Sequence, residues 1–499
     1  MKKFISVLLT LSIMLGAFTC AAVNTSAASK KTAKVSLKNK TTVLVISKKD
    51  GKTSYGSTKI TLKKAKGVKL IKTTFKSSKK AVAKVNKKGK VTALKTGSAK
   101  ITVKVKYTFK KKSYKKSLSF KVSVISDYKD FLRRLSKFSN KLYNMSAKDN
   151  SDNYTMSPVS VFMALSMLYS SADDNVKAEI KKLTGMKASD FKYTAKLMKS
   201  LNKEYKDNEK VLCKLNLTNS IWYNSGEEVK TDALDKIAKE LYCDVLDAPF
   251  KSDNAEANKK VRDYIKDKTN GLIDKDFDLS DETLFALINT LYFKDNWDAS
   301  DLSTKKMDFT SSNGTKKREY LIGRYLEGRV QETKHARYFY STTMHGYKIK
   351  LVLPKKGCTL KQAMSASELN KINSRKDYKI TSKDKSRHYT RCIFPSFKVE
   401  SDTPLKDVFE ENGYLNNAFY AFDSPFTDEK LQVSDIAHSS VLDVNKKGIE
   451  GAAVTLIMIE KTSAIMAKKV YHDFTLDRSF GYILTDPNDV VLFTGQITK

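Results

Sequence analysis

Residues 441–469 read VLDVNKKGIEGAAVTLIMIEKTSAIMAKK, and this stretch decides the fold. It begins as a strand, VLDV, passes a Lys-Lys-Gly turn and enters a run of Gly, Ala and β-branched residues. Strand periodicity puts every second residue on one uncharged face, whereas Glu450 and Glu460 fall on the other face. The uncharged face consists of Ile449, Gly451, Ala453, Thr455, Ile457 and Ile459. The pattern allows two interpretations: a hairpin strand followed by a long surface loop, or an exposed strand that can pair with a sheet later.

The length and net charge of the chain indicate how many domains to expect and that one region is strongly basic. With 499 residues it is long enough for two or more domains and a large core. The net charge is +39, from 93 Lys and Arg against 54 Asp and Glu, so at least one region must be strongly basic. Five cysteines occur without a C-x-x-C pair, so neither a zinc site nor a disulfide scaffold is expected.

Residues 1–28 have the features of a secretory signal peptide. Lys2 and Lys3 precede an apolar run over residues 4–18, and a Ser-Ala-Ala sequence at 26–28 offers a cleavage site. The apolar run is too short for a stable membrane anchor, and no second hydrophobic span follows it. We therefore expect a secreted, extracellular protein without a transmembrane segment.

Residues 29–126 have the pattern of a small, strongly basic β-sandwich. Seven short segments of β-type alternation follow one another at intervals of roughly ten residues. They are TTVLVIS, STKITLKK, VKLIKTTF, AVAKVN, KVTAL, AKITVKVKYTF and LSFKVSVI. The line from Phe75 to Thr102, with Gly89 and Gly97 at turns that need positive φ, resembles the bacterial Ig-like domain, group 2. Domains of this family serve as surface spacers or adhesive modules.

The charge of this segment raises the question of a polyanionic partner. About thirty lysines face a single acidic residue, Asp50, and a lysine-rich face attracts polyanions. The lysines either bind an anionic cell-wall polymer, which would hold the protein at the cell surface, or form the solvated face of a spacer. Nucleic acid is not expected as a partner, because no aromatic residues alternate with the lysines to stack on bases.

Residues 127–499 change to a mixture of helical and strand patterns. An amphipathic helix is predicted over 127–143, and Ser157-Pro158 opens a second helix, since proline suits a first helical position. A strand is predicted at 217–223, and the sequence YCDVLDAPF follows at 242–250. Residues 258–273 have a helical pattern, with Gly271 as a natural C-terminal stop. The sequence LFALINTLYFKDNW at 284–297 is the most distinctive of these motifs.

These motifs, together with residues 441–469 and the sequences around them, resemble the serpins in both residues and order. The flanking sequences are LQVSDIAH at 431–438, FTLDRSF at 474–480 and LFTGQI at 492–497. The resemblance covers about 126–499, so the domains are expected to be a signal peptide at 1–28, the Ig-like domain at 29–126 and a serpin domain at 127–499. It implies an α+β fold with a large central β-sheet, about nine helices and an exposed reactive loop.

The resemblance also assigns roles to single residues. Ser157, Ser160, Asn289 and His438 correspond to the shutter, where the sheet opens, and Asn289 and His438 are partners there. Trp297 corresponds to the breach, the point at which the loop first enters the sheet. The reactive-loop hinge corresponds to Gly448, Ile449, Glu450, Gly451, Ala452, Ala453, Val454 and Thr455.

The mechanism that the resemblance implies is suicide inhibition of a serine protease. The protease attacks a bond in the loop and forms an acyl-enzyme, and the freed loop then inserts into the central sheet and traps the protease. The family's usual hinge length puts the reactive bond at Thr462–Ser463, although the long stretch that follows allows cleavage as late as Met466–Ala467. Small or apolar residues there suit an elastase-like or subtilisin-like protease, with a trypsin-like enzyme as the second choice.

Four residues depart from the family pattern. Lys446 replaces a hinge Glu, Ile449 replaces Thr or Ser, Gly451 replaces Ala, and Asp295 replaces a Gly. Lys446 and Ile449 motivate the alternative of a non-inhibitory serpin that acts as a binding or adhesion module. The five histidines show no ligand spacing, and neither H-E-x-x-H, G-x-S-x-G, a Walker loop nor a dinucleotide fingerprint occurs. We therefore expect a monomer that is not an enzyme and needs no cofactor or metal.

Overall fold

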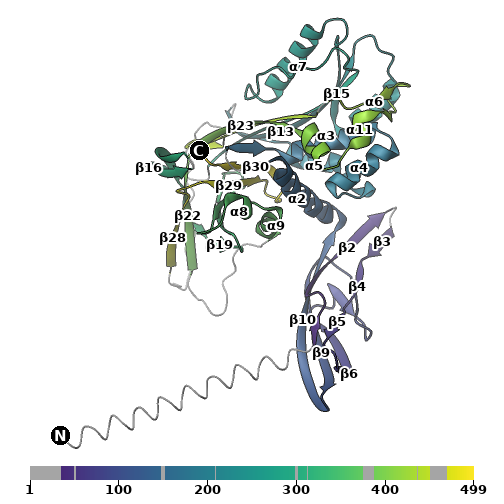
Figure 1. The fold of residues 1–499 in the computed structure, drawn as a ribbon, viewed down its shortest axis with the longest axis vertical. Coiled ribbons are helices and arrows are strands. Elements are labelled where there is room, and N and C mark those ends of the chain that lie inside the picture. Colours follow the sequence, from purple (N-terminus) through teal and green to yellow (C-terminus); the bar gives the residue numbers. More distant parts are fainter. Residues whose placement is uncertain are drawn as a thin grey trace, which may run out of the picture. The chain divides into compact units, whose positions relative to one another are not determined.

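The computed structural model describes residues 35–49, 52–147, 152–207, 210–297, 302–311, 313–374, 387–434, 436–449 and 469–499 (Figure 1). The expected signal peptide at 1–28 lies outside these ranges. The chain divides into two compact units, Met1–Asp130 and Phe131–Lys499. Each unit is considered separately below.

The N-terminal unit is built almost entirely from strands. The described part contains ten: β1 (Val35–Leu37), β2 (Thr41–Lys49), β3 (Lys52–Tyr55), β4 (Ser57–Lys59), β5 (Leu62–Lys64), β6 (Lys69–Ser77), β7 (Ala83–Val85), β8 (Lys90–Ala93), β9 (Gly97–Phe109) and β10 (Lys112–Ser126). All seven predicted strands are present, but one is broken into β4 and β5, and β1 and β3 were not predicted. The largest sheet has the order β3-β2-β10-β9-β6, with β10 and β2 parallel.

This unit has its own hydrophobic core. Alternate residues of β9, including Ile101, Val103 and Val105, are buried against Phe120 and Val122 of β10. The left-handed conformation predicted for Gly89 is present, with φ +78°, and a Cβ there would lie 2.8 Å from the ring of Phe75. The architecture is therefore a strand-rich unit with one core, and its assignment as an Ig-like domain stays a prediction.

The C-terminal unit contains ten α-helices among its described residues, where about nine were expected. They are α2 (Asp127–Ser146), α3 (Pro158–Ser171), α4 (Asp174–Thr184), α5 (Thr194–Leu201), α6 (Thr231–Leu241), α7 (Asn254–Lys268), α8 (Leu360–Ala363), α9 (Ala366–Ser374), α10 (Leu405–Glu411) and α11 (Asn416–Tyr420). As predicted, α3 starts at Pro158; the Ser157 side chain caps it by accepting a hydrogen bond from the Ser160 N–H.

The central sheet has the strand order β12-β13-β15-β27-β26-β23, and β14 pairs with β13. Its strands are β12 (Lys203–Asp207), β13 (Lys210–Asn224), β14 (Cys243–Ala248), β15 (Phe285–Asn296), β23 (Phe397–Pro404), β26 (Ala437–Asn445) and β27 (Gly448–Ile449). Helix α3 packs on one face of β15, and Val261 and Ile265 of α7 pack on the other face, against Ala286. The centre of the sheet therefore lies between two helices (Figure 1).

Two further sheets complete the unit. One has the order β11-β30-β29-β21-β20-β19 and the other the order β16-β17-β22-β18, with β28 parallel to β22. Their strands are β11 (Tyr154–Met156), β16 (Ser303–Ser311), β17 (Gly314–Ile322), β18 (Leu326–Glu327), β19 (Gln331–Glu332), β20 (Ala336–Thr342), β21 (Lys348–Pro354), β22 (Arg387–Pro395), β28 (Lys469–Thr475), β29 (Phe480–Thr485) and β30 (Val491–Ile497). Two short strands, β24 (Phe422–Asp423) and β25 (Lys430–Leu431), pair separately.

Candidate functional site: an open position in the central sheet

The two-residue strand β27 marks an unfilled strand position in the central sheet. Gly448 and Ile449 pair antiparallel with Asn296 and Asp295 of β15 on one side. On the other side they pair with Asn445 and Val444 of β26. Below these residues, β15 continues to Phe285 and β26 to Ala437 with no strand between them among the described residues. We call this gap between β15 and β26 the slot.

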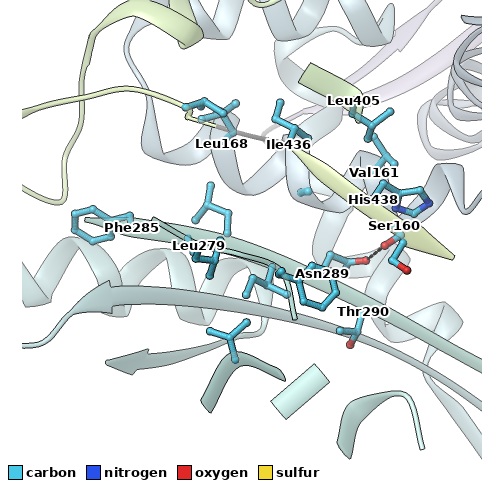
Figure 2. Close-up of a pocket in the computed structure, with 18 of the residues that line it drawn as sticks. Ser160, Val161, Leu168, Leu279, Phe285, Asn289, Thr290, Leu405, Ile436 and His438 are labelled. Atoms are coloured by element: carbon cyan, nitrogen blue, oxygen red, sulfur yellow. Dashed lines mark hydrogen bonds between the residues drawn. The ribbon is translucent and has the colours of Figure 1, made fainter. Parts of the chain in front are cut away.

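The slot opens into a cavity of about 460 Å³. Its walls come from both strands and from the helices on either face of the sheet, as Figure 2 shows. Most of the lining is apolar, with Val161 and Leu168 of α3 on one face and Val261 and Ile265 of α7 on the other. A wall of this composition accommodates small or apolar side chains, whereas an unpaired charge placed there would be costly.

The predicted shutter supplies part of the polar lining. The Asn289 amide donates to the Thr218 carbonyl at 3.1 Å and to Asn219 Oδ1 at 2.7 Å. The Ser160 hydroxyl of α3 donates to Asn289 Oδ1, and the two side chains point toward each other in Figure 2. Asn289 thus joins β13, β15 and α3, and all of its polar atoms are used, as a buried amide requires.

His438 holds the opposite side of the slot. Its Nε2 accepts the Ser157 N–H at 3.0 Å, so it too binds the start of α3. Burial lowers the pKa of His438 to about 4, so the ring is neutral at pH 7. The expected Asn289–His438 pair is not among the hydrogen bonds of the described residues, because β15 and β26 stand apart at this level. Each residue contacts α3 instead.

The predicted breach residue, Trp297, lies at the upper end of the slot. Its indole N–H donates to the Asn445 carbonyl at 2.7 Å, across the turn that leads from β26 to β27. The ring packs edge-on against Phe394 with centroids 6.0 Å apart. Trp297 therefore fixes the point at which the chain turns into the sheet.

Backbone geometry at the hinge explains why glycine occupies position 448. Gly448 has φ +158°, and a Cβ there would lie 2.4 Å from the Asp295 carbonyl oxygen. The next residue, Ile449, is fully buried in the sheet, whereas Lys446 is exposed in the turn. The two departures from the expected hinge sequence are thus accommodated in this state.

The remaining predicted loop residues lie outside the part of the chain that the structure describes. They are Glu450, Gly451, Ala452, Ala453, Val454, Thr455 and the predicted reactive bond Thr462–Ser463. On the far side of this segment, the chain is described again from β28, which begins at Lys469.

Sequence analysis missed a cluster next to the breach. Cys213, Asp295 and His345 lie together, with donor atoms all within 4.8 Å of one another. Among the described residues this is the only group of three or more such side chains with a geometry that could hold a metal ion. The signal available in the sequence was Asp295 itself, a carboxylate on the inward face of a buried strand.

Comparisons with known proteins agree with this architecture. The family model described as serpin (serine protease inhibitor) matches residues 133–499. An uncharacterised serpin-like protein of Thermococcus kodakarensis is 26% identical over 396 residues, which cover 74% of this chain and 85% of that protein. Serpin A3-7 of Bos taurus is 26% identical over 385 residues, covering 72% of this chain and 87% of the relative.

Solved structures agree as well. The thermophilic serpin tengpin in its native state superposes with a TM-score of 0.61 at 24% identity, covering 74% of this chain and 94% of tengpin. The Arabidopsis serpin AtSerpin1 in its native stressed conformation gives 0.58 at 19% identity, covering 75% of this chain and 98% of that one. At these identities the likeness shows the fold alone. No helix in the described part of the chain has the length and apolar character needed to cross a membrane.

Proposed function

The chain belongs to the serpin family of serine protease inhibitors, and on that premise we propose that it inhibits a serine protease by inserting its cleaved loop into the slot. The observation that carries the proposal is β27, a strand of only two residues held between β15 and β26 above an open cavity. A strand that has begun but not been completed needs further chain, and the sequence after Ile449 supplies it.

The pairing of β27 fixes the register in which this chain would insert. The counting starts from the pairs that Ile449 makes with Asp295 of β15 and Val444 of β26. Because the pairing is antiparallel, each further loop residue would pair with the residue one number lower in β15 and one number lower in β26. Six residues on, Thr455 comes opposite both Asn289 and His438. The small Thr side chain would then face α3 between the two shutter residues, as Ile449 does higher in the sheet.

The same register makes the uncharged face of the loop its inward face. Gly451, Ala453, Ile457 and Ile459 would follow Ile449 toward α3, whereas Glu450 would point to the opposite face. A slip by one residue would bury Glu450 and Glu460, which carries a large desolvation cost. One register is therefore strongly favoured.

Strand length supports the predicted reactive bond. β15 has 12 residues, and the register aligns them with residues 448–459. Because β27 already supplies Gly448 and Ile449, insertion would add residues 450–459, about 33 Å of new strand. Thr462 would follow the end of the strand by three residues, so a protease attached there as an acyl-enzyme would be carried from one end of the sheet to the other. Thr462–Ser463 suits an elastase-like or subtilisin-like protease, and a trypsin-like enzyme acting at Lys461 or Lys468 ranks second.

The proposal includes an extracellular setting. The N-terminal signal pattern directs export, and the lysine-rich unit at 29–126 would bind an anionic cell-wall polymer and hold the inhibitor at the cell surface. The alternative of a non-inhibitory binding module rested on Lys446 and Ile449. Burial of Ile449 in the sheet and exposure of Lys446 to solvent support the inhibitory proposal over this alternative, which the same protease experiment tests.

The experiment is incubation of the full chain with elastase, subtilisin and trypsin, followed by denaturing gels and mass spectrometry. We expect a complex at the summed mass that resists denaturant, together with a C-terminal fragment that begins at Ser463. The matched control is the protease with its catalytic serine blocked, which forms no acyl bond. Complete cleavage by all three proteases without such a complex would refute the inhibitory function.

A further inference from the structure

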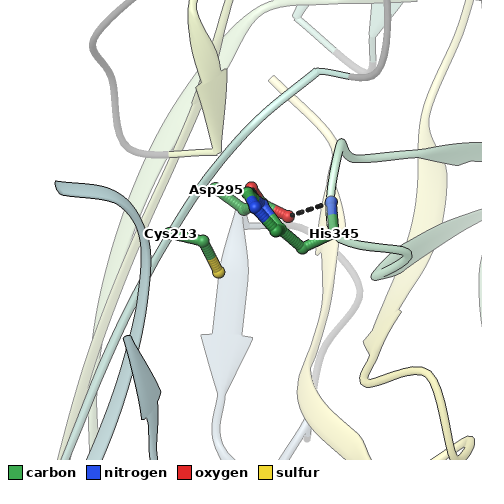
Figure 3. Close-up of side chains that lie close together, drawn as sticks. All are labelled: Cys213, Asp295 and His345. Carbon is green, nitrogen blue, oxygen red and sulfur yellow. Dashed lines mark hydrogen bonds and ion pairs between the residues drawn. The ribbon is translucent and has the colours of Figure 1, made fainter. Parts of the chain in front are cut away.

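We propose that Cys213, Asp295 and His345 form a zinc-binding site at the breach, directly beside the hinge of the reactive loop. The inference rests on the geometry of these side chains and does not depend on the proposed inhibitory function. Figure 3 shows the three side chains gathered at one point, from two strands of the central sheet and from the turn between β20 and β21.

Strand register brings two of the ligands together. Cys213 of β13 and Asp295 of β15 are direct cross-strand partners, so their side chains lie on the same face of the sheet. Asp295 is in turn the partner of Ile449 in β27. The cluster therefore occupies the same row of the sheet as the first inserted residue of the hinge.

The third ligand, His345, is held in place by contacts with β15 and β12. The His345 backbone N–H donates to Asp295 Oδ2 at 3.1 Å, and its ring nitrogen Nδ1 lies 2.7 Å from Oδ1. The ring of Tyr205, on β12, stacks on the imidazole with centroids 4.5 Å apart. Such surrounding contacts orient metal ligands in proteins.

The donor set suits zinc. Thiolate, imidazole and carboxylate are its three usual protein ligands, and a site with three of them keeps its fourth position for water. Around a tetrahedral Zn²⁺ ion, donor atoms lie roughly 3.3–3.8 Å apart. The present limit of 4.8 Å between any two donors requires a contraction of about 1 Å, and the 2.7 Å between His345 Nδ1 and Asp295 Oδ1 requires a widening of about 0.6 Å. Both changes are within the reach of a side-chain rotation.

Burial gives the site a physical reason to bind a cation. Asp295 and Cys213 are completely buried. A buried carboxylate is costly unless it is paired, and its acid-base partner here is a histidine. Zn²⁺ would replace the thiol proton of Cys213, which leaves to solvent, and the ion keeps its oxidation state. The His345 side chain is 18% exposed, which leaves an entry path from solvent.

Zinc bound there would connect three elements at the entry to the slot. β13, β15 and the β20–β21 turn would share one ion, in addition to the hydrogen bond from Met344 N–H to the Asn296 carbonyl at 2.8 Å. We therefore expect zinc to raise the melting temperature of the uncleaved protein by a few degrees, because a ligand that binds only the folded state stabilises it.

The test uses the untagged full chain, reduced and freed of metal with a chelator. Titration with Zn²⁺ against a chromophoric chelator should show one tight site per chain, and Co²⁺ should give a thiolate-to-cobalt charge-transfer band in the near ultraviolet. Cys213→Ser should abolish the band, and His345→Gln should weaken binding by at least about tenfold. Cys243→Ser and His335→Gln, which alter a half-buried cysteine and a partly exposed histidine outside the cluster, should leave both signals unchanged.

Two results would overturn the site. One is the absence of stoichiometric uptake by the wild-type chain, and the other is a cobalt band that persists in Cys213→Ser or disappears in Cys243→Ser. Because the wild-type titration needs no variant, a folding defect in Cys213→Ser would leave the test decisive. Protease inhibition plays no part in these readouts, so failure of the zinc site and failure of the inhibitory function remain distinguishable.

Discussion

Replacement of Thr455 by arginine tests the register of loop insertion at its most sensitive point. The register places residue 455 between Asn289 and His438, facing α3. Asn289 already uses its polar atoms in hydrogen bonds with Ser160 of α3 and with Thr218 and Asn219 of β13. His438 is neutral at pH 7 because burial lowers its pKa to about 4. Neither flanking residue can supply an anion, so the guanidinium of Thr455→Arg would enter the slot unpaired.

The expected effect is large. An unpaired buried charge costs several kcal/mol even after the surroundings relax. A cost of about 4 kcal/mol in the insertion step slows it roughly a thousandfold, since each 1.4 kcal/mol is a factor of ten. Insertion would then lose the competition with hydrolysis of the acyl-enzyme, and Thr455→Arg would become a substrate of the protease.

The stability of the cleaved protein gives a readout that needs no cognate protease. On the inward face, insertion buries two further large apolar side chains, Ile457 and Ile459, each worth about 1.5–3 kcal/mol, or roughly 3–6 kcal/mol together. For a domain of this size, 1 kcal/mol corresponds to about 1–3 °C in Tm, so cleavage of the wild-type loop should raise Tm by several degrees.

Thr455→Arg should lose most of this rise, while its Tm before cleavage stays that of the wild type. The matched control is Glu450→Arg, which carries the same new charge at a position that the register directs to the opposite face of the sheet, next to Lys294 and Asp443. We expect Glu450→Arg to retain the rise. An undiminished rise in Thr455→Arg, or its loss in Glu450→Arg alone, would refute the register.

Three further predictions concern the shutter, the hinge and the breach. The pKa of His438 falls from 6.5 in the unfolded chain to about 4 in the fold, so its contribution is fully present above pH 6.5 and is lost as the pH falls toward 4. This loss amounts to about 3 kcal/mol, and urea titrations between pH 7 and 4 should show it in the wild type and not in His438→Gln. Gly448→Ala should lower the Tm of the uncleaved protein by several degrees, because the new Cβ at position 448 would collide with the backbone of β15. Gly451→Ala should instead stabilise the inserted strand by about 0.5–1 kcal/mol, because alanine loses less conformational entropy in a strand than glycine. Trp297→Phe keeps an aromatic ring against Phe394 but removes the hydrogen bond to β26, and should lower the unfolding free energy by about 1 kcal/mol in chemical denaturation.

Each of these predictions has a result that would contradict it. An unchanged pH profile in His438→Gln would mean that other groups carry the acid sensitivity. Equal melting temperatures for Gly448→Ala and the wild type would show that β27 can move away from the Asp295 carbonyl without cost. A Trp297→Phe variant as stable as the wild type would remove Trp297 from the contacts that hold the hinge.

The local elements at the site could be predicted from the sequence because each depends on residues close together in the chain. The strand before the hinge, the Lys446–Lys447 turn and the inward side of Ile449 follow from period-two alternation and from Gly448. The start of α3 follows from Ser157-Pro158 in the same way. The roles of Asn289, His438 and Trp297 came from family resemblance, because a single polar residue in an apolar strand does not indicate its partner.

What could not be predicted depends on the spacing and register of strands that are distant in the sequence. Alternation shows which side of β15 and β26 faces the core, but it is the same whether the two strands are adjacent or separated by a slot. The expected Asn289–His438 contact failed for this reason: the gap between the strands leaves each residue bound to α3. In the proposed inserted state Thr455 would fill the gap between them.

The Cys213–Asp295–His345 cluster also depends on strand register that could not be predicted from the sequence. Asp295 was noticed only as a departure from a family glycine, since nothing near it in the sequence suggests why a carboxylate should be buried there. Its partners come from register with β13 and from a turn of another sheet, which brings in Cys213 and His345. With glycine at position 295, a metal ion bound by Cys213 and His345 would have no carboxylate ligand. Asp295→Gly should therefore remove the zinc site while keeping the backbone pairs of β27, and so separate metal binding from loop insertion within one position of the sheet.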